Sequence, residues 1–505
     1  MTDPASPQAT PPRALLASTA LASIVLAEFP AEREVDPAEV RATVEASGVV
    51  LVVLDDDPTG TQSVADLPVL TAWERSDIHW GLRQGAPAIY VLTNTRSLDP
   101  ATAQQRNREI VQNTLAASAE LGVPVAFVSR SDSTLRGHFP LETDTIAATL
   151  ADSGADAIDG VVIVPAFPDA GRVTIGGTHY MRSGDELTPV AETEFARDAT
   201  FGFTSSDLRE YVDEKTAGRV RAADVVTLHL GIIRAGTEAI ADALRDVTGG
   251  TPIVVDAVTE NDLRALALGL AAAEAAGKRF LYRVGPPFVR ARIGQAVRAP
   301  LTAAEVYGPA GSDAVGGLVV VGSHVGVTTR QLARLTASRP VARVLEVDIA
   351  AVLDDALTDA HLDAVVADAT AALATGDVVI HTSRTLRTAD DAAASLDISR
   401  RVSAAIVRVV QLILAARPPR FVVAKGGITS SDVAAHGLGI RHAIVRGPML
   451  PGIVSLWEPV DGPARGIPYI VFAGNVGDDD SLARVVETLA APSTTHEKSS
   501  HVTVD

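Results

Sequence analysis

The sequence predicts an α/β protein with two domains, each a mainly parallel sheet flanked by helices, and an active site in the cleft between the domains. Three observations support this expectation. The chain has 505 residues, whereas single hydrophobic cores stop growing at about 250 to 300 residues. Short apolar runs alternate with helical stretches, which is typical of parallel sheets covered by helices on both faces. The alternation breaks into Gly-, Pro- and Arg-containing loops near residues 283–316 and then resumes.

Strand candidates are short apolar runs rich in Val, Ile and Leu, and helix candidates are the longer stretches between them. In the first half we expect strands over residues 48–54, 88–92, 124–128, 160–164, 225–230 and 252–256. In the second half we expect strands over residues 316–323, 343–347, 377–381, 420–424, 442–446 and 469–474. The longest helix candidates span residues 100–121, 260–277 and 390–416.

The domain boundaries follow from this pattern. We expect a helical N-terminal extension over residues 1–45, a first domain over 46–290, a second domain over 315–490 and a disordered tail over 491–505. Residues 13–29 resemble the apolar core of a signal peptide. The Pro-rich leader before them carries little positive charge, and no clean cleavage site follows. An N-terminal helix packed on the first domain is therefore the favoured interpretation.

Composition limits the classes of partner. The net charge of −19, without a clustered basic footprint, argues against nucleic-acid binding. The absence of cysteine excludes disulfides and thiolate metal sites and fits a cytoplasmic protein. No run approaches the roughly 20 apolar residues of a membrane span. We therefore expect a soluble protein that binds neither nucleic acid nor membrane.

Three adjacent aspartates follow the first strand candidate, at residues 55–57. Ligands of open α/β sheets bind beyond the carboxyl ends of strands, so this position favours a function. A single aspartate here would more simply cap a helix or form an Asx-turn. Three like charges repel each other unless donors compensate them. They could accept hydrogen bonds from substrate hydroxyls, and one could act as a general base.

The loop after the third strand candidate, residues 129–138, is dense in arginine, hydroxyl and acidic side chains. Arginine suits bidentate recognition of a carboxylate, and the hydroxyls suit a polyhydroxylated ligand. The alternative is a solvated loop with an Arg–Asp pair. Residues 165–172 add Asp169 and Arg172, whereas His179 is more simply a packing or hydrogen-bonding residue than a catalyst.

Glycine-containing turns follow three strand candidates in the second half, at Gly322, Gly426 and Gly474. Their backbone N–H groups suit a phosphate chain. Asp478, Asp479 and Asp480 could hold Mg²⁺ or could equally complement the dipole of the helix that follows. Walker A, GxGxxG, kinase HRD or DFG, HExxH and GxSxG sequences are all absent.

Several short motifs are specific when taken together. They are Asp56-Asp57-Pro58-Thr59-Gly60, RSDSTLRG (130–137), PAFPDAGRVTIGGTHY (165–180), ETEFARD (192–198), Gly322-Ser323, Gly426-Gly427-Ile428-Thr429-Ser430, Pro451-Gly452 and Gly474-Asn475-Val476-Gly477. From about residue 48 to 490 the chain resembles the four-carbon acid sugar kinases. These two-domain, ATP-dependent enzymes phosphorylate tetronates such as threonate, erythronate and 3-oxo-tetronate, usually on the terminal hydroxyl. The chain departs from the family where lysine is frequent, at Arg130 and Phe472, and where glutamate is usual, at Ile428.

The resemblance implies a role for each motif. Asp56 or Asp57 would be the catalytic base, Arg130 or Arg136 would grip the carboxylate, and ATP with Mg²⁺ would be the cofactors. The implied substrate-binding residues are Asp55, Thr59, Gly60, Arg130, Asp132, Ser133, Thr134, Arg136, His138 and Arg172. The implied nucleotide-binding residues are Gly322, Ser323, Gly426, Gly427, Ile428, Thr429, Ser430, Gly474 and Asn475, with Asp479 as a candidate Mg²⁺ ligand.

Two other classes of function remain open at this point. A sugar-acid dehydrogenase would also have two α/β domains, but it should carry a dinucleotide fingerprint. A non-catalytic regulator that binds sugar acid and nucleotide would be stabilised by its ligands without turning them over. A homodimer is the default expectation for such an enzyme.

Overall fold

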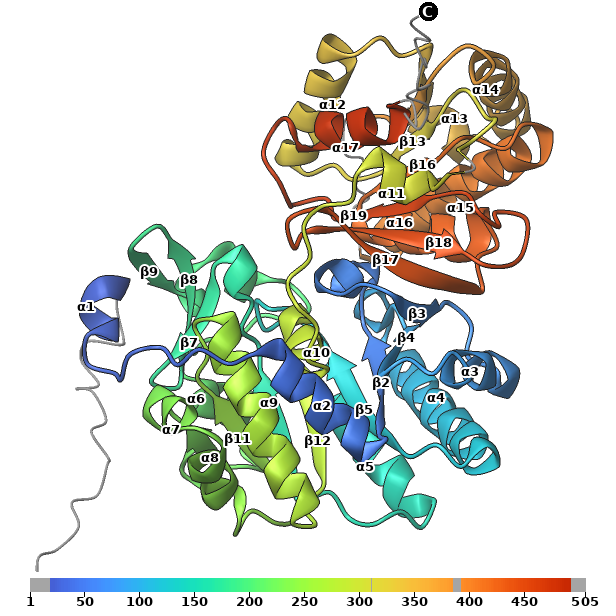
Figure 1. Cartoon of the computed structure of the whole chain (residues 1–505). Helices are drawn as coiled ribbons and strands as arrows, with labels where there is room; N and C mark the ends of the chain where they lie inside the picture. Colours follow the sequence, from blue (N-terminus) through green and yellow to red (C-terminus); the bar gives the residue numbers. More distant parts are fainter. Residues whose placement is uncertain (1–18, 310, 385–391, 492–505) are drawn as a thin grey trace, which may run out of the picture. The chain divides into compact units, whose positions relative to one another are not determined.

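The computed structural model describes residues 19–309, 311–384 and 392–491 and divides into two units, residues 1–297 and 298–505 (Figure 1). Both units are α/β, with helices beside a mainly parallel set of strands, which confirms the expected fold class. Residues 1–18 of the expected N-terminal extension and residues 492–505 of the expected tail lie outside the described residues.

The strands of the first unit lie in the order β10-β11-β6-β12-β5-β2-β4-β3, and neighbours run parallel. Every residue of β2 is buried, which explains the continuous apolar run that ends in Asp55. The strands are β2 (Val50–Asp55), β3 (Leu67–Leu70), β4 (Ala88–Leu92), β5 (Val125–Arg130), β6 (Gly160–Val164), β10 (Val226–Leu228), β11 (Thr251–Val255) and β12 (Phe280–Val284).

Helices flank these strands. Asp99 caps the longest of them, because its side chain accepts a hydrogen bond from the N–H of Thr102 (3.0 Å). The helices are α2 (Pro37–Ser47), α3 (Arg75–Leu82), α4 (Pro100–Leu121), α5 (Leu141–Asp152), α6 (Leu208–Lys215), α7 (Leu230–Ala235), α8 (Thr237–Leu244), α9 (Glu260–Ala275) and α10 (Pro286–Arg292).

The expectation of loops over residues 283–316 is wrong in two places. The end of β12 and the whole of α10 lie at its start, and the short helix α11 (Ala303–Tyr307) lies further along. Arg283 interrupts the apolar run of β12 but is buried beside Glu142, with which it forms an ion pair. Pro286 occupies the first turn of α10, where proline is tolerated because that N–H has no helical partner. Both residues resemble loop residues in the sequence but are compatible with regular structure in this context.

A small antiparallel sheet of the first unit was not foreseen. It has the order β1-β9-β8-β7, with β1 (Ala20–Leu21), β7 (Arg172–Ile175), β8 (Thr178–Ser183) and β9 (Glu186–Pro189). Gly176 and Gly177 form the two-residue turn between β7 and β8, and both have positive φ, as such tight hairpins require. The short helix α1 (Ala22–Leu26) packs Ala22 and Val25 against this sheet.

The strands of the second unit lie in the order β17-β18-β19-β16-β13-β15-β14. β18 is antiparallel to both its neighbours, and the other pairs are parallel. The strands are β13 (Leu318–Val321), β14 (Arg343–Val347), β15 (Val378–Thr382), β16 (Val422–Lys425), β17 (His442–Leu450), β18 (Val454–Pro459) and β19 (Tyr469–Phe472). The helices are α11 (Ala303–Tyr307), α12 (Gly326–Ser338), α13 (Ile349–Leu353), α14 (Thr358–Ala372), α15 (Ala392–Ala416), α16 (Gly427–Asp432) and α17 (Ser481–Ala490).

Within the described ranges, no helix combines the length and the apolar character that a bilayer-spanning helix needs.

Candidate active site

The loops after β5, β2 and β4 meet at one edge of the first unit, because these strands are parallel neighbours in that order. The N–H of Asp56 donates to the carbonyl of Arg130 (3.4 Å), and the N–H of Arg96 donates to the carbonyl of Asp56 (3.2 Å). These bonds join the aspartate triplet to the loops on either side. The acidic and basic residues expected from two separate motifs therefore form one cluster.

Asp55 and Arg130 form a buried ion pair beneath this cluster. The guanidinium of Arg130 donates to the carboxylate of Asp55 and to the carbonyl of Asp57, and only 2% of either side chain of the pair is exposed. Burial raises the pKa of Asp55 to about 7, although Arg130 acts in the opposite direction. Arg130 is therefore engaged inside the protein, so of the two arginines expected to grip a ligand carboxylate only Arg136 is free for that role. Asp55 likewise has an internal role.

Gly60 lies directly over this ion pair. A Cβ at this position would overlap both the Nε of Arg130 and the carboxylate of Asp55. We expect Gly60→Ala to destabilise the first unit by about 1–3 kcal/mol, because a buried ion pair cannot move aside without losing partners. Chemical denaturation measures this, with Gly231→Ala as the control, because a Cβ at Gly231 has nothing within 4 Å. Equal stability of the two variants would contradict the close approach.

Asp56 is held by Arg96. The Nε and Nη2 atoms of Arg96 donate to the two carboxylate oxygens of Asp56 at 3.2 and 2.7 Å. Burial raises the pKa of Asp56, while Arg96 and Arg130 oppose the shift. Both oxygens of Asp56 are thus occupied, and its side chain is almost completely buried.

Asp57 is the most accessible aspartate of the triplet, with 19% of its side chain exposed. Its Oδ1 accepts hydrogen bonds from the N–H (2.9 Å) and the hydroxyl (2.5 Å) of Thr59, and its Oδ2 lies 3.6 Å from Nη1 of Arg96. Burial acts to raise its pKa, but Arg96, Arg130 and the hydrogen bonds from Thr59 together outweigh burial and hold the pKa below the usual aspartate value. Asp57 therefore presents an ionised carboxylate at the surface of the cluster.

The loop between β5 and α5 adds a second partly exposed carboxylate, Asp132. Its Oδ2 accepts hydrogen bonds from the Thr134 hydroxyl and from Nε of Arg136 (2.6 Å). Burial opposes ionisation, but Arg96 and Arg136 outweigh it and keep the pKa of Asp132 well below its ordinary value. Arg96 thus influences three of the four aspartates at this edge.

His179 holds the same loop in place through two hydrogen bonds. Its Nε2 donates to the carbonyl of Ser133 (2.7 Å), and its Nδ1 accepts from the hydroxyl of Thr174 (2.9 Å). The tautomer follows from the partners, because a carbonyl oxygen can only accept. Burial lowers the pKa of His179 to about 4, so the ring is neutral. The structure therefore shows His179 as a buried hydrogen-bonding residue, as expected from the sequence.

Two arginines lie at the border of the cluster and have donor groups available to an anion. Arg136 lies over the ring of Phe195, 5.0 Å from its centroid, and its Nη1 is 3.7 Å from Asp198. Arg172 donates through Nη1 to the carbonyl of Ala170 (2.5 Å), and among the described residues nothing accepts a hydrogen bond from its buried Nε. Burial lowers the pKa of Arg172, and Asp132 opposes the shift. Both guanidinium groups could therefore accommodate a ligand carboxylate.

A buried layer supports these loops. Arg283 donates to the hydroxyl of Ser129 (2.7 Å) and forms an ion pair with Glu142. Gly137, at φ +124°, passes so close that a Cβ there would lie 2.9 Å from Arg283 and 3.0 Å from Asp56. His138 contacts the carbonyls of Thr95 and Leu98, each 3.0 Å from its Nε2. His138 therefore holds the loop after β4 in place, and its expected contact with a substrate stays a prediction.

Arg96, Glu142 and Arg283 were missed by sequence reasoning. Arg96 follows the expected strand over residues 88–92 by four residues. The strand-end rule states that ligands of open α/β sheets bind beyond the carboxyl ends of the strands. It was applied to the loops after the first, third and fourth strand candidates, and it would have identified Arg96 if it had been applied to this loop too. Arg283 could not be found in this way, because β12 itself was not predicted.

In the second unit, β13, β16 and β19 are neighbours, and glycine follows the carboxyl end of each at Gly322, Gly426 and Gly474. A Cβ on Gly322 would overlap Thr429, and one on Gly474 would overlap Ser323. A Cβ on Gly426, at φ +132°, would lie 3.2 Å from the Cβ of Ser323. The three glycines, Ser323 and Thr429 therefore form one cradle of backbone and hydroxyl groups, which fits the phosphates of a nucleotide.

The other expected nucleotide-binding residues differ in accessibility. Ser430 is buried and donates its hydroxyl to the carbonyl of Ala424 (2.8 Å), so its role is internal. Gly427 and Ile428 open α16, where the side chain of Ile428 is exposed. Asn475 is exposed beside Gly474. Thr328 donates to the carbonyl of Gly474 (2.7 Å) and so holds this last turn in place.

Asp479 is paired with an arginine in the structure, and its role as a Mg²⁺ ligand stays a prediction. It accepts a hydrogen bond from Nε of Arg330 (2.8 Å), and its neighbours Asp478 and Asp480 pair with Arg484 and Arg334. Across the described ranges, no three His, Cys, Asp or Glu side chains come together as metal ligands. The triplet lies before α17 and fits the alternative interpretation, a set of charges that complements a helix N-terminus.

Lys425 at the end of β16 is fully buried under the cradle. Its Nζ donates to the carbonyl of Ala473 (2.7 Å) and lies 3.7 Å from the centroid of the Phe472 ring. Burial lowers the pKa of Lys425 from 10.5 to about 7. Lys425 therefore joins the ends of β16 and β19 through a hydrogen bond to the residue before Gly474.

The low pKa of Lys425 predicts a pH-dependent stability. Between about pH 7 and 10.5 the unfolded chain binds this proton and the folded chain does not, so stability should rise with pH in that window. We expect the Tm of Lys425→Met to exceed that of the wild type at pH 7, and this difference to shrink as the pH approaches 10. Differential scanning fluorimetry at several pH values measures both. A difference that does not change with pH would contradict the burial argument.

Comparison with known proteins assigns both units. A family model described as a sugar-binding N-terminal domain matches residues 51–292, and one described as a nucleotide-binding C-terminal domain matches residues 318–482. A D-threonate kinase from Bordetella bronchiseptica is 30% identical over 458 residues, which cover 88% of this chain and 98% of that protein. A D-erythronate kinase from Heliobacterium modesticaldum is 32% identical over 184 residues, which cover 36% of this chain and 37% of that protein.

Solved structures support the fold. A Salmonella typhimurium LT2 protein aligns with a TM-score of 0.62 and 19% identity, over 86% of this chain and 98% of the other. A Haemophilus influenzae protein aligns with a TM-score of 0.56 and 19% identity, over 87% and 100% of the two chains. Because the family models match most of the sequence and one relative aligns along nearly its whole length, the chain belongs to the four-carbon acid sugar kinase family.

Proposed function

We propose that this chain is an ATP-dependent kinase that phosphorylates the terminal hydroxyl of a four-carbon sugar acid such as threonate, erythronate or 3-oxo-tetronate. The observation that carries the proposal is the cluster in the first unit. There Arg96 acts on the partly exposed carboxylates of both Asp57 and Asp132, and Arg136 and Arg172 lie near Asp132. Relatives named D-threonate kinase and D-erythronate kinase give the substrate class.

The cluster in the first unit suits a small hydroxy acid. Arg136 and Arg172 would bind the carboxylate, since each has N–H donors that its contacts within the protein do not use. Asp57 and Asp132 would accept hydrogen bonds from the hydroxyls, since both are ionised and partly exposed. Arg96 would hold the carboxylate of Asp57 in place, while Arg130 and Arg283 would support the loops from inside the protein through Asp55 and Glu142. The substrate would then be oriented through both its ends.

The cradle in the second unit suits the phosphates of ATP. The backbone N–H groups that follow β13, β16 and β19, with the hydroxyls of Ser323 and Thr429, would bind them. Mg²⁺ commonly accompanies ATP and would neutralise phosphate charge. The described carboxylates offer it no grouped ligands, so we assign it no protein ligand.

The chemistry is an in-line displacement at the γ-phosphorus. The substrate hydroxyl oxygen forms the new P–O bond while the bond to the β–γ bridging oxygen breaks, and ADP leaves. The hydroxyl proton would pass to Oδ2 of Asp57, whose Oδ1 is already engaged by Thr59. Asp56 has both oxygens on Arg96 and would orient that arginine rather than take the proton.

Coupled ADP release with Mg·ATP tests the proposal. The panel would contain D- and L-threonate, D- and L-erythronate, 3-oxo-tetronates and a five-carbon acid, and we expect turnover with at least one four-carbon acid. ATP-induced stabilisation without turnover across the panel would instead favour a non-catalytic regulator. Binding of NAD in a parallel titration would favour a dehydrogenase. The homodimer and the cytoplasmic location expected from the sequence remain predictions.

A further inference from the structure

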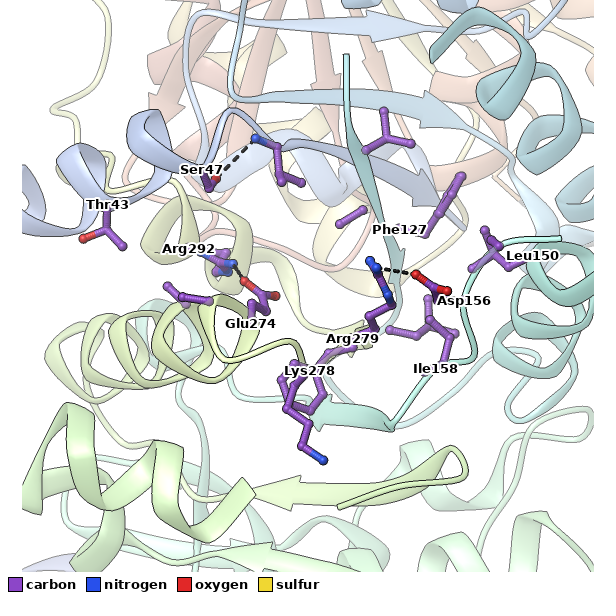
Figure 2. Close-up of a pocket in the computed structure, with 18 of the residues that line it drawn as sticks. Thr43, Ser47, Phe127, Leu150, Asp156, Ile158, Glu274, Lys278, Arg279 and Arg292 are labelled. Carbon is purple, nitrogen blue, oxygen red and sulfur yellow. Dashed lines mark hydrogen bonds and ion pairs between the residues drawn. The ribbon is translucent and has the colours of Figure 1, made fainter. Parts of the chain in front are cut away.

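The first unit contains a cavity of about 870 Å³ that the kinase site does not use (Figure 2). It lies at the amino ends of β5 and β12, whereas the acidic and basic cluster described above lies at their carboxyl ends. Its wall includes residues 125–127 of β5 and residues 280–281 of β12. The cavity is therefore separate from the candidate active site, at the opposite edge of the same strands.

The cavity exists because two neighbouring strands diverge. β5 pairs with β2 along all six of its residues, and β12 pairs with β6 along all five of its residues. Between β5 and β12, however, the register covers only residues 128–130 and 282–284. The first residues of both strands are thus separated from each other, and these are the residues that line the cavity. A ligand between them would lie beside strand backbone that is unpaired on the side facing the gap.

Helix α2 supplies another wall, through Ala42, Thr43, Ala46 and Ser47. This helix precedes the segment that the sugar-binding family model matches, which begins at residue 51. Its position is fixed by a close approach to Gly294, at φ +64°, where a Cβ would overlap the backbone of Arg41. Arg41 also donates to the carbonyl of Gly294 (3.1 Å). The extension before the matched domain therefore completes the cavity.

The lining suits a molecule with an apolar body and a negative charge. Phe127, Leu150 and Ile158 provide apolar surface, as Figure 2 shows. The charged lining residues are three cations and two anions: Lys278, Arg279 and Arg292, with Asp156 and Glu274. Arg279 pairs with Asp156, and Arg292 pairs with Glu274.

The third cation, Lys278, is paired outside the cavity, and one buried donor of the lining has no acceptor. The amine of Lys278 donates to the carbonyl of Val247 (2.7 Å) and lies 3.7 Å from Asp159, which does not line the cavity. The buried Nε of Arg292 finds no acceptor in the described part of the chain. A buried donor without an acceptor is costly, so an added anion would be favourable at this wall.

We propose that this cavity is a second binding site, for a small organic anion with an apolar or aromatic body. Its volume is within the usual range of small-molecule sites, about 300–1,000 Å³. Its apolar lining with a few polar groups is also typical of such sites. The anion would accept a hydrogen bond from the buried Nε of Arg292, and the apolar body would fill the gap between β5 and β12. The proposal does not depend on the kinase activity, because every residue it uses lies outside the candidate active site.

The full-length protein can be tested with the fluorescent anion 1-anilinonaphthalene-8-sulfonate, in the presence of saturating ATP and threonate to occupy other sites. We expect one saturable site per chain. Ala46→Trp should weaken binding at least tenfold, because the indole would occupy the wall at α2. Ala38→Trp is the matched control, since Ala38 is exposed on the same helix and does not line the cavity. It should bind the probe as the wild type does.

Two further measurements complete the test. Ala126→Leu should also weaken binding, because it fills the cavity from β5 instead of from α2. The uncharged analogue N-phenyl-1-naphthylamine should bind at least tenfold more weakly than the anion. Unchanged binding in both Ala46→Trp and Ala126→Leu would place the probe elsewhere and overturn the site. Equal binding of the charged and uncharged probes would overturn the assignment of an anion.

Discussion

Asp57→Asn is expected to lower kcat for the sugar acid by about a hundredfold or more while leaving the KM for ATP nearly unchanged. The asparagine keeps an oxygen that can accept both hydrogen bonds from Thr59, so the turn after β2 should persist. What it loses is the ionised Oδ2, the atom that faces Arg96 and that would take the proton. Steady-state kinetics with each substrate varied in turn measure this separation.

The matched control is Asp207→Asn. Asp207 also accepts a hydrogen bond from the N–H two residues later (2.9 Å), also pairs with an arginine, and has 15% of its side chain exposed. It lies at the start of α6, outside the acidic cluster, so its replacement should leave kcat unchanged. Normal turnover in Asp57→Asn would rule out Asp57 as the base. A loss of equal size in both variants would point to a general effect on folding.

The position of the acidic cluster could be predicted from the sequence, but the role of each residue within it could not. The strand-end rule requires only that an apolar run be recognised, and it therefore found Asp55–Asp57 and the 129–138 loop. Whether an arginine faces the ligand or the interior depends on burial, which is a property of the packed structure. The guanidinium of Arg130 faces the interior, because Gly60 packs closely against it and the buried carboxylate of Asp55 pairs with it.

The unpredicted residues share one physical feature. Glu142 and Arg283 are almost completely buried charged groups and Arg96 is a partly buried one, and each is stable there because another element supplies the opposite charge. In a sequence such residues resemble loop or surface residues, as the missed strand β12 illustrates. Lys425 differs, because its amine is buried against neutral groups at the end of β19, the carbonyl of Ala473 and the ring of Phe472.

Glycine positions, in contrast, were informative from the sequence alone. Gly322, Gly426 and Gly474 each follow a strand, and the three strands proved to be neighbours. A glycine at a strand end predicts a close approach of backbone without specifying the partner, and here each partner is a hydroxyl side chain of the same cradle. The three acidic residues at 478–480 do not require a close approach of backbone in the same way. In the structure they pair with surface arginines.

Arg172→Met is expected to raise the KM for the sugar acid by at least about 30-fold, because removing one partner of a desolvated charge pair costs about 2 kcal/mol or more. Methionine keeps most of the apolar stem, so the change removes mainly the guanidinium. Arg172 begins β7 and has a buried donor that no described residue accepts from, which is why we expect it to bind the ligand carboxylate. The KM for ATP should not change.

Two comparisons separate carboxylate binding from a structural role of Arg172. Arg182→Met is the matched control, since Arg182 is an exposed arginine on the neighbouring strand β8 and should tolerate the change. The uncharged tetritol erythritol, tested as a weak alternative acceptor or as an inhibitor, lacks the carboxylate. If Arg172 binds that group, Arg172→Met should weaken the sugar acid and leave the affinity for erythritol as it is in the wild type. An equal loss for both ligands would mean that Arg172 shapes the site without contacting the carboxylate, and the carboxylate would then be assigned to Arg136 alone.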